Sequence, residues 1–497
     1  MGSKVAPRAW IPDVRFLRSC ALIRLRRSEF AQRKRREAHQ FRDELLSALW
    51  APGFVDRQCS DIVVPFMRIC FVVDYRSPIA RNWLDFFIAG EHEVHVISTH
   101  GATAPVPRPA TLHCVPMGLA SLRSQPMLRR HMAMTAGREV STDTRRLSIA
   151  GSLLRRITTE LQHTYKWVAP YEARLHAGRI AKIIGRIRPD LVHAMRIPFE
   201  GILAARAMTT MKIPLLVSVW GNDFTLHAAE SRPVAMATRF VMSRADALLA
   251  DCERDIRLAK SWGLDARKPN LLVPGNGGIR TDLFHPGTRN EALAQRWEIL
   301  PADPVVINPR NFRPSYVRND LFFAAIPAVL KAIPNAKFLC VGMYGNPIAE
   351  TWVRRFDIGH AVRLIPAMDR EGMGDLFRLA DVAVSPSNHD GTPNTLLEAM
   401  ACGAFPVAGD IESVREWIES GRNGLLCNPN DASALAHAII TALTNRALRE
   451  GARAANHAII VERAEFNSGM RRAERFYEEL VDAAARNSDG GLRVGAS

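Results

Sequence analysis

The sequence has little that would carry it across a membrane or link it through disulfides. Its apolar stretches, such as residues 61–74, are interrupted by charge or proline well before the ~20 residues that a membrane-spanning helix needs. Its 8 cysteines are dispersed, with no CxxC pair and no histidine at zinc-ligand spacing. We therefore expect no membrane span, reduced thiols in a cytosolic protein and no structural metal. Aromatic residues make up only 7% and are not interleaved with basic ones, which argues against nucleic acid as a partner.

The sequence is rich in hydrophobic residues and carries a net positive charge. Hydrophobic residues at 47% and charged residues at 23% exclude a disordered, collagen-like or coiled-coil chain. The length of 497 residues predicts two large domains with extensions, or three smaller ones. The formal net charge is +16, of which residues 1–66 contribute +6. A positive field favours anionic partners, which could be nucleic acid, anionic lipid headgroups or phosphorylated small molecules.

The basic N-terminal extension, residues 1–66, allows two interpretations. Arginines and lysines at 24–36 lead into Phe41, Leu45, Leu46 and Leu49, which recur at helical spacing. This pattern predicts a basic amphipathic helix on an anionic membrane surface. The alternative is a mis-assigned start, because residues 67–73 have the pattern of the first buried strand of a domain.

From residue 67 onward, short apolar runs alternate with stretches of helical length. Helices are expected at 171–187 and 201–211. Buried strands are expected at 69–73, 94–97, 191–193, 215–219, 247–250, 271–273, 305–307, 336–341, 362–365, 381–384 and 405–408. Such alternation indicates parallel sheets covered by helices on both faces.

The alternation stalls at residues 282–287, a stretch that contains Pro286 and Gly287. We place a domain boundary there, which divides the chain into an N-terminal domain (67–286) and a C-terminal domain (287–462). A last helix is expected at 463–485, within a C-terminal helix and tail of residues 463–497. The predicted fold class is α/β, with two doubly wound, Rossmann-like domains that face each other across a cleft.

The most informative stretch is 384–403, where a strand ends in a polar loop and a helix follows. Thr392 suits the N-cap, Pro393 the first helical position and Gly403 the position just past the helix end. The helix N-terminus, with its free N–H groups, then lies at the carboxyl end of a parallel strand. This arrangement predicts a phosphate site.

Glu398 is the anomaly in this helix, because its neighbours at 396–401 are otherwise apolar. A buried carboxylate without partners is costly, so something must bond to it. A ribose diol near the phosphates would supply two donors. An arginine or a backbone amide elsewhere in the core is the alternative.

The run at 390–403, DGTPNTLLEAMACG, resembles the acidic-x7-Glu motif of glycosyltransferase family 4, the retaining group 1 enzymes of GT-B fold. In that family the first acidic residue contacts the donor sugar, the amides of the next loop hold the distal phosphate, and the second glutamate binds the ribose. The resemblance assigns these roles to Asp390, to a loop and helix start that bind the nucleotide, and to Glu398. The nucleotide-binding residues implied are Gly391, Thr392, Pro393, Asn394 and Leu397. Asp390 is one methylene shorter than the usual glutamate.

Other segments between about residues 67 and 485 resemble the same family in the same order, including 189–193, 219–223, 245–250 and 277–286. The family's arginine and lysine for the donor pyrophosphate follow the first strand of the C-terminal domain. Here Arg310 takes the first position, and Arg318 replaces the lysine after a longer loop. A guanidinium can hold phosphate through two hydrogen bonds.

Two positions depart from the family pattern in the N-terminal domain. The loop after the first strand is 74–78 rather than a Gly-Gly turn, and Trp220 stands where many members have a histidine. Tryptophan cannot relay a proton, so Trp220 either packs in the core or stacks on a sugar. A lone histidine such as His193 at a strand end is more often structural.

The resemblance implies transfer of a hexosyl group from a nucleotide-sugar, UDP- or GDP-linked, to an acceptor hydroxyl with retention of configuration. It assigns the acceptor to the N-terminal domain and the donor to the C-terminal domain, with no metal and no further cofactor. We expect a sugar or lipid-linked acceptor, cell-surface polysaccharide or glycolipid synthesis, and a cytoplasmic enzyme with possible contact to the inner face of the membrane. The alternatives are another GT-B activity, an epimerase or phosphorylase, and a non-catalytic anion- or membrane-binding scaffold.

Overall fold

The structure is a computed structural model that describes residues 66–100, 109–115, 117, 170–313 and 316–490, without the side chains of 488–490. The chain divides into two units, residues 1–66 and residues 67–497, and everything below concerns the second. The helix expected at 24–49 lies outside the described residues.

The N-terminal domain is built on a parallel sheet of seven strands in the described part of the chain. The strands are β1 (Arg68–Val73), β2 (Glu93–Ser98), β3 (Thr111–Cys114), β4 (Leu191–Ala194), β5 (Leu215–Val219), β6 (Ala247–Ala250) and β7 (Asn270–Leu272). Their order is β3-β2-β1-β4-β5-β6-β7, in which the direction of winding reverses between β1 and β4. This is the doubly wound arrangement expected from the sequence.

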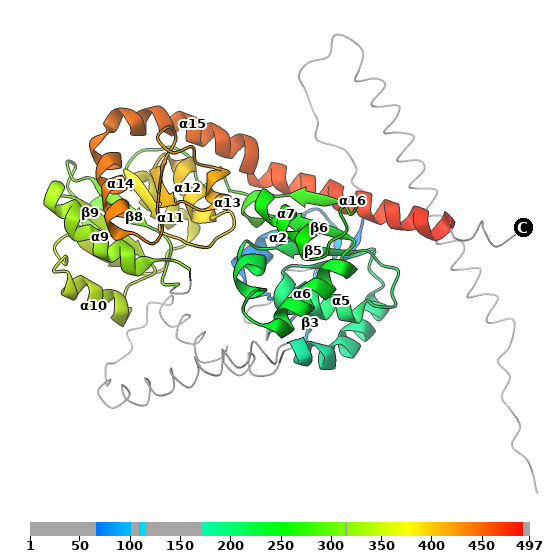
Figure 1. The fold of residues 1–497 in the computed structure, drawn as a ribbon. Coiled ribbons are helices and arrows are strands. Elements are labelled where there is room, and N and C mark those ends of the chain that lie inside the picture. Colours follow the sequence, from blue (N-terminus) through cyan, green and yellow to red (C-terminus); the bar gives the residue numbers. More distant parts are fainter. Residues whose placement is uncertain (1–65, 101–108, 116, 118–169, 314–315, 491–497) are drawn as a thin grey trace, which may run out of the picture. The chain divides into compact units, whose positions relative to one another are not determined.

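Helices cover both faces of this sheet (Figure 1). They are α2 (Pro78–Ala89), the helix of residues 170–187, α5 (Ile202–Ala207), α6 (Arg232–Arg244) and α7 (Glu253–Ser261), with short turns η1 (Ile197–Gly201), η2 (Asp223–His227) and η3 (Pro274–Asn276). The two-residue period of β1 produces the two cores. Cys70 and Val72 enter one cluster, whereas Ile69, Phe71 and Val73 enter the other.

The C-terminal domain repeats this plan on a second parallel sheet, ordered β10-β9-β8-β11-β12-β13. Its strands are β8 (Val305–Asn308), β9 (Lys337–Val341), β10 (Val362–Ile365), β11 (Val382–Ser385), β12 (Phe405–Gly409) and β13 (Leu425–Cys427). Its helices are α8 (Glu291–Arg296), α9 (Asn319–Ala332), α10 (Pro347–Arg355), α11 (Arg370–Leu379), α12 (Asn394–Cys402), α13 (Glu412–Arg415), α14 (Ala432–Thr444) and α15 (Arg446–Ala464). Val306 packs into one hydrophobic cluster of this domain, whereas its neighbours Val305 and Ile307 pack into the other.

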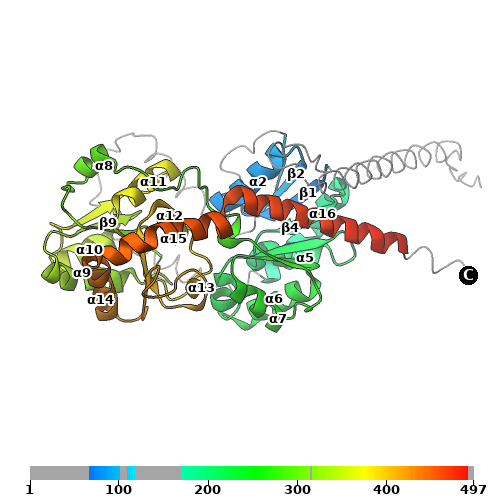
Figure 2. The same cartoon turned by 90° about the horizontal axis from the view of Figure 1, so that it is seen from above.

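The last helix differs from the expectation. We expected one helix at 463–485, but α15 ends at Ala464 and α16 (Phe466–Gly490) begins after Glu465, which has extended backbone angles. Ile279 causes the break, because its amide donates to the Ala464 carbonyl and its carbonyl accepts from the Phe466 amide. Beyond the break, α16 packs against α2 and β4 of the N-terminal domain (Figure 2).

Every strand expected from the sequence lies within one residue of an observed strand at either end. Two strands were missed. β3 is half-exposed at the sheet edge, and β13 has three residues, so neither shows a buried apolar run. The helix expected at 201–211 ends earlier, at Ala207, and residues 208–210 form a turn.

Within the described residues, no helix combines the length and the apolar character needed to cross a membrane. The domain limits at 286 and 462 stay predictions.

Candidate functional site

The switch point of the second sheet brings two polar loops together. β8 and β11 are neighbours that lie far apart in the sequence, so the loops at their carboxyl ends meet at one edge. Arg310 follows β8, and its guanidinium forms an ion pair with Asp390 in the loop after β11. Arg310 also donates to the Thr395 hydroxyl at 3.3 Å, on the first turn of α12. The structure thus unites two residues that the sequence singled out separately.

The loop that carries Asp390 enters α12 one residue later than expected. Pro393 rather than Thr392 occupies the N-cap, and Asn394 is the first helical residue. Thr392 does not cap because its hydroxyl donates to the backbone carbonyl of Asp251. The expected end of the helix is confirmed, since Gly403 adopts a left-handed φ of 94°.

Glu398 is half-buried inside α12, with the first turn of the helix between it and the loop. Burial raises the pKa of its carboxyl to about 7, against the lowering effect of the Arg370 and Arg310 charges. No donor among the described residues forms a hydrogen bond with it. The sequence suggested two kinds of partner for Glu398, a ribose diol or a core arginine or amide. The described residues supply no core arginine or amide bonded to it.

This raised pKa leads to a prediction about stability. A carboxyl whose pKa rises from 4.5 to about 7 on folding holds its proton more tightly in the folded chain, so ionisation destabilises the fold as pH rises through that window. We expect Glu398→Gln to match the wild type in free energy of unfolding near pH ~4 and to exceed it above pH ~7. Urea unfolding at several pH values measures this. The control is Glu462→Gln at an exposed position, whose difference from the wild type in free energy of unfolding should not change with pH. The same pH-independent difference for Glu398→Gln would contradict the prediction.

The backbone amides of the loop already face anionic oxygens. The Gly391 amide donates to the Asp390 carboxylate at 3.1 Å, and the Thr392 amide donates to the Asp251 carboxylate at 3.3 Å. Next to them, the first amides of α12 have no acceptor within the helix. The loop and the helix start therefore have the donors that a phosphate needs.

Asp251 and Arg254, from the N-terminal domain, hold this loop. Asp251 follows β6, and Arg254 lies in the first turn of α7. The Arg254 guanidinium donates to the Asp390 carbonyl and to the Gly221 carbonyl, both at 2.6 Å. It also pairs with Asp255 at 2.8 Å. One buried arginine thus links the backbone of the two domains beside the candidate site.

Glycines make this approach possible. A Cβ added to Gly221 would lie 2.1 Å from the Gly391 nitrogen and 2.3 Å from the Gly391 Cα. A Cβ added to Gly391 would lie 2.3 Å from the Asp251 carboxylate. Only glycine fits at both positions.

Buried polar atoms without a partner among the described residues gather near this contact. They include Arg310 Nε, Asp251 Oδ1, Asp255 Oδ2, Asn276 Oδ1 and Trp220 Nε1. Such atoms are rare in proteins, and each one calls for a ligand, a water or a proton. Burial raises the pKa of the Asp251 and Asp255 carboxyls. The charge of Asp255 raises the pKa of Asp251 further, and the charge of Asp223 raises the pKa of Asp255.

A cation is one partner that these carboxylates could accept. One ligand atom from each of Asp251, Cys252 and Asp255 lies within 4.8 Å of the others. Arg254 already pairs with Asp255, so a metal would compete with a fixed positive charge. The residues present therefore fit a guanidinium better than a metal ion.

Two residues predicted to bind the nucleotide have other contacts in the structure. The Arg318 guanidinium is held by Asp320 at 2.9 Å and by Asn430 at 2.6 Å. Leu397 is fully buried in a hydrophobic cluster, so its side chain contributes packing. Their roles toward a nucleotide stay predictions.

In the N-terminal domain, Trp220 is half-buried. The Arg196 guanidinium lies over its ring, with the guanidinium carbon 5.3 Å from the ring centroid.

His193 is fully buried between the hydroxyls of Ser218 and Tyr477, and burial lowers its pKa to about 3. A neutral, enclosed imidazole of this kind is structural, as its position at a strand end suggested.

Sequence reasoning missed Asp251, Arg254 and Glu200. Glu200 is 4% exposed, accepts a hydrogen bond from Thr99 at 3.0 Å and has a pKa raised by burial to about 7. It follows Phe199, whose φ of 65° and ψ of −71° are strained for a residue with a side chain. The available signal was position: Asp251 directly follows β6, which ends at Ala250, whereas Arg254 and Glu200 lie in the first turns after β6 and β4.

Two known domain families match the chain over both sheets. The family described as "Glycosyl transferase 4-like domain" matches residues 80–275, and the family described as "Glycosyl transferases group 1" matches residues 303–445. The second match contains Arg310, Arg318 and the whole 390–403 run.

Curated relatives match part of the chain. A D-inositol 3-phosphate glycosyltransferase of Catenulispora acidiphila is 27% identical over 209 residues, which are 40% of this chain and 48% of the relative. One of Geodermatophilus obscurus is 28% identical over 230 residues, 44% of this chain and 50% of the relative. The chain spans about half the length of these relatives.

Solved structures share the fold. Sucrose-phosphate synthase from Thermosynechococcus elongatus has a TM-score of 0.62 at 16% identity, over 84% of this chain and 99% of that one. Anabaena HepE in complex with UDP-glucose has a TM-score of 0.59 at 15% identity, over 83% of this chain and 100% of that one. Both are GT-B glycosyltransferase structures, so the fold expected from the sequence is confirmed.

Proposed function

This chain belongs to the group 1 glycosyltransferases, and from that premise we propose that it moves a sugar from a nucleotide-sugar donor to an acceptor hydroxyl. The observation that carries the proposal is the meeting of Arg310, Asp390 and the first turn of α12 at the switch point of the second sheet. A cation, donor amides and a helix N-terminus at one place form a site for a pyrophosphate.

Each residue has a task in this proposal. Arg310 neutralises the pyrophosphate as it leaves, and the N–H groups of Gly391, Thr392, Asn394 and Thr395 hold its outer phosphate, since Pro393 has none. Glu398 accepts hydrogen bonds from the ribose diol, and Asp390 orients the donor sugar. Arg318 would reach the pyrophosphate only by leaving Asp320 and Asn430.

We propose that the reaction retains the anomeric configuration and uses no metal. The family resemblance implies that the leaving phosphate itself takes the proton of the acceptor hydroxyl on the same face of the sugar. Trp220, which stands where many members have a histidine, cannot take this proton. Arg310 and the helix N-terminus stand where a divalent cation would otherwise balance the phosphates.

The donor and the setting are proposals of the same kind. The complex of HepE with UDP-glucose supports a UDP-sugar, with a GDP-sugar as the alternative. The acceptor in this proposal is a sugar or a lipid-linked sugar, as in cell-surface polysaccharide or glycolipid synthesis. The net charge of +16 supports work at an anionic surface, which is the cytoplasmic side of a membrane in this proposal.

The experiment is nucleotide release by the full-length protein from a panel of UDP-, GDP- and ADP-sugars. We expect release from one donor and its loss in Glu398→Ala, because the ribose contact disappears. Glu462→Ala, which removes an exposed carboxylate from α15, should keep the wild-type rate. Release from no donor, together with no thermal stabilisation by any nucleotide, would overturn the proposal.

A further inference from the structure

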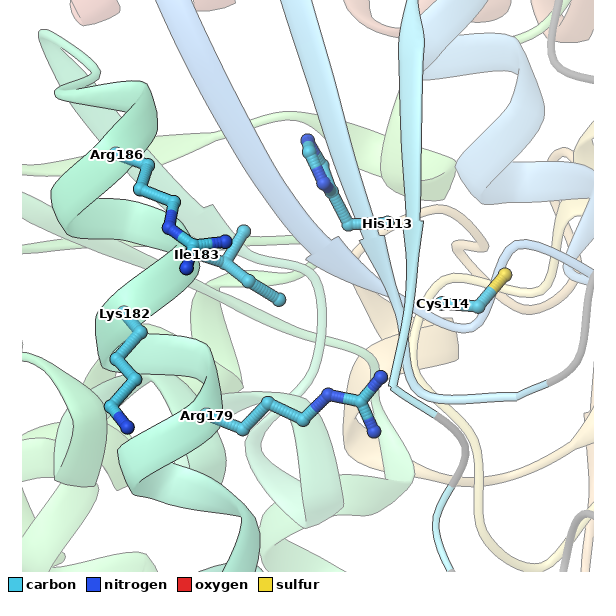
Figure 3. A pocket seen from close by; sticks show the side chains of 6 residues that line it. All are labelled: His113, Cys114, Arg179, Lys182, Ile183 and Arg186. Atoms are coloured by element: carbon cyan, nitrogen blue, oxygen red, sulfur yellow. The ribbon is translucent and has the colours of Figure 1, made fainter.

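A basic pocket lies on the N-terminal domain, outside the site described above. It is a hollow of about 370 Å³ between the helix of residues 170–187 and the edge strand β3 (Figure 3). Its lining consists of Arg179, Lys182, Ile183 and Arg186 from the helix and of His113 and Cys114 from β3. No acidic side chain is among these described lining residues.

The three cations share one face of the helix, because they are spaced three and four residues apart. In Figure 3 the Arg179 side chain extends from the helix toward the strand. Within the described part of the chain, none of the three forms an ion pair or hydrogen bond. Other helical arginines do have such partners, as Arg378 has Asp375 at 2.7 Å. Like charges gathered without a counter-charge repel one another, so the pocket favours an anion.

We propose that this pocket binds a phosphate ester, as an anion site separate from the one at Arg310. Two guanidiniums and an ammonium supply charge-assisted donors for the phosphate oxygens. Ile183 offers apolar surface to the carbon part of the ester. The volume is that of a small ligand site. The proposal does not depend on the sugar-transfer reaction.

The ester could belong to a soluble molecule or to a phospholipid headgroup. Tyr171 and Leu175, on the same helix, are 56% and 83% exposed. Gly178 and Gly185 lie beside open space, since a Cβ at either would meet no described residue within 4 Å. A helix face that is basic and partly apolar is suited to a lipid surface.

The test compares the full-length wild type with Arg179→Glu/Lys182→Glu. The matched control is Lys331→Glu/Arg354→Glu, which makes the same charge change at exposed positions of α9 and α10. Calorimetric titration uses sn-glycerol 3-phosphate. Flotation uses vesicles of phosphatidylglycerol, with phosphatidylcholine vesicles for comparison. Arg186→Gln provides a milder variant should the double reversal fail to fold.

We expect the wild type and the control to bind glycerol phosphate equally and the pocket variant to bind it about tenfold more weakly or worse. Any phosphate held at Arg310 contributes equally to all three proteins. A parallel loss of flotation with phosphatidylglycerol would identify a lipid source, whereas unchanged flotation would identify a soluble ester. Equal titrations for the pocket variant and the control, or no binding by the wild type, would overturn the proposal.

Discussion

Replacing Arg310 with alanine is expected to lower the rate of sugar transfer by about 10²–10³-fold, the usual cost of removing one preorganised group that stabilises developing charge. The guanidinium contacts side chains of the loop and first turn of α12, through its ion pair with Asp390 and its hydrogen bond to Thr395. Its Nε is buried without a partner among the described residues, which leaves a donor for the pyrophosphate. Steady-state transfer with the donor found in the panel measures the loss in kcat and in kcat/KM.

Arg313→Ala is the matched control. Arg313 lies three residues further on, is exposed and bonds the Tyr316 hydroxyl at 2.8 Å, so its loss should change the rate little. Arg310→Lys should fall between the two, because it keeps the charge and loses the two-pronged geometry. Equal activity of Arg310→Ala and Arg313→Ala would remove Arg310 from the site.

Gly221→Ala is expected to lower transfer by a similar factor, although Gly221 has no side chain to offer a substrate. Its Cβ would lie 2.1 Å from the Gly391 nitrogen, a distance that forces backbone to move. The atoms in the way belong to the loop whose amides are proposed to hold the phosphate. Movement of this loop also strains the hydrogen bonds from Arg254 to the Asp390 and Gly221 carbonyls. We therefore expect the effect mainly on kcat, with each domain still folded.

A control separates this clash from backbone strain. Gly221 has a φ of +45°, which itself disfavours alanine. Gly345 has a φ of +66° with nothing within 4 Å of a Cβ, so Gly345→Ala carries the strain without the clash. Gly345→Ala should lose about 1–2 kcal/mol of stability from the left-handed backbone alone, and Gly221→Ala should lose at least as much, but only Gly221→Ala should lose activity. Full activity of Gly221→Ala would show that the contact between the two loops is not needed for transfer.

Much of the candidate site was predictable because its signals are local. The cap and end signals of α12, the carboxylate at 398 and the arginine after β8 are properties of short segments. A strand followed by a polar loop and a helix places such residues at one edge of a parallel sheet. The partners of those residues were not predictable in this way. Thr392 was expected to cap its own helix, but the structure gives its hydroxyl to Asp251, 141 residues away.

The sequence by itself determined the elements, their alternation and the α/β class, because hydrophobic period and turn residues act over a few positions. It also placed the 390–403 motif on a loop and a helix start. Only the tertiary structure decided that Asp251, Arg254 and Gly221 of one domain hold the loop of the other. It likewise decided that α16, at the end of the chain, completes the core of the first domain, with Tyr477 against His193. The physical reason is that these contacts join residues more than 100 positions apart in the sequence, and they form through complementary packing that no local pattern encodes.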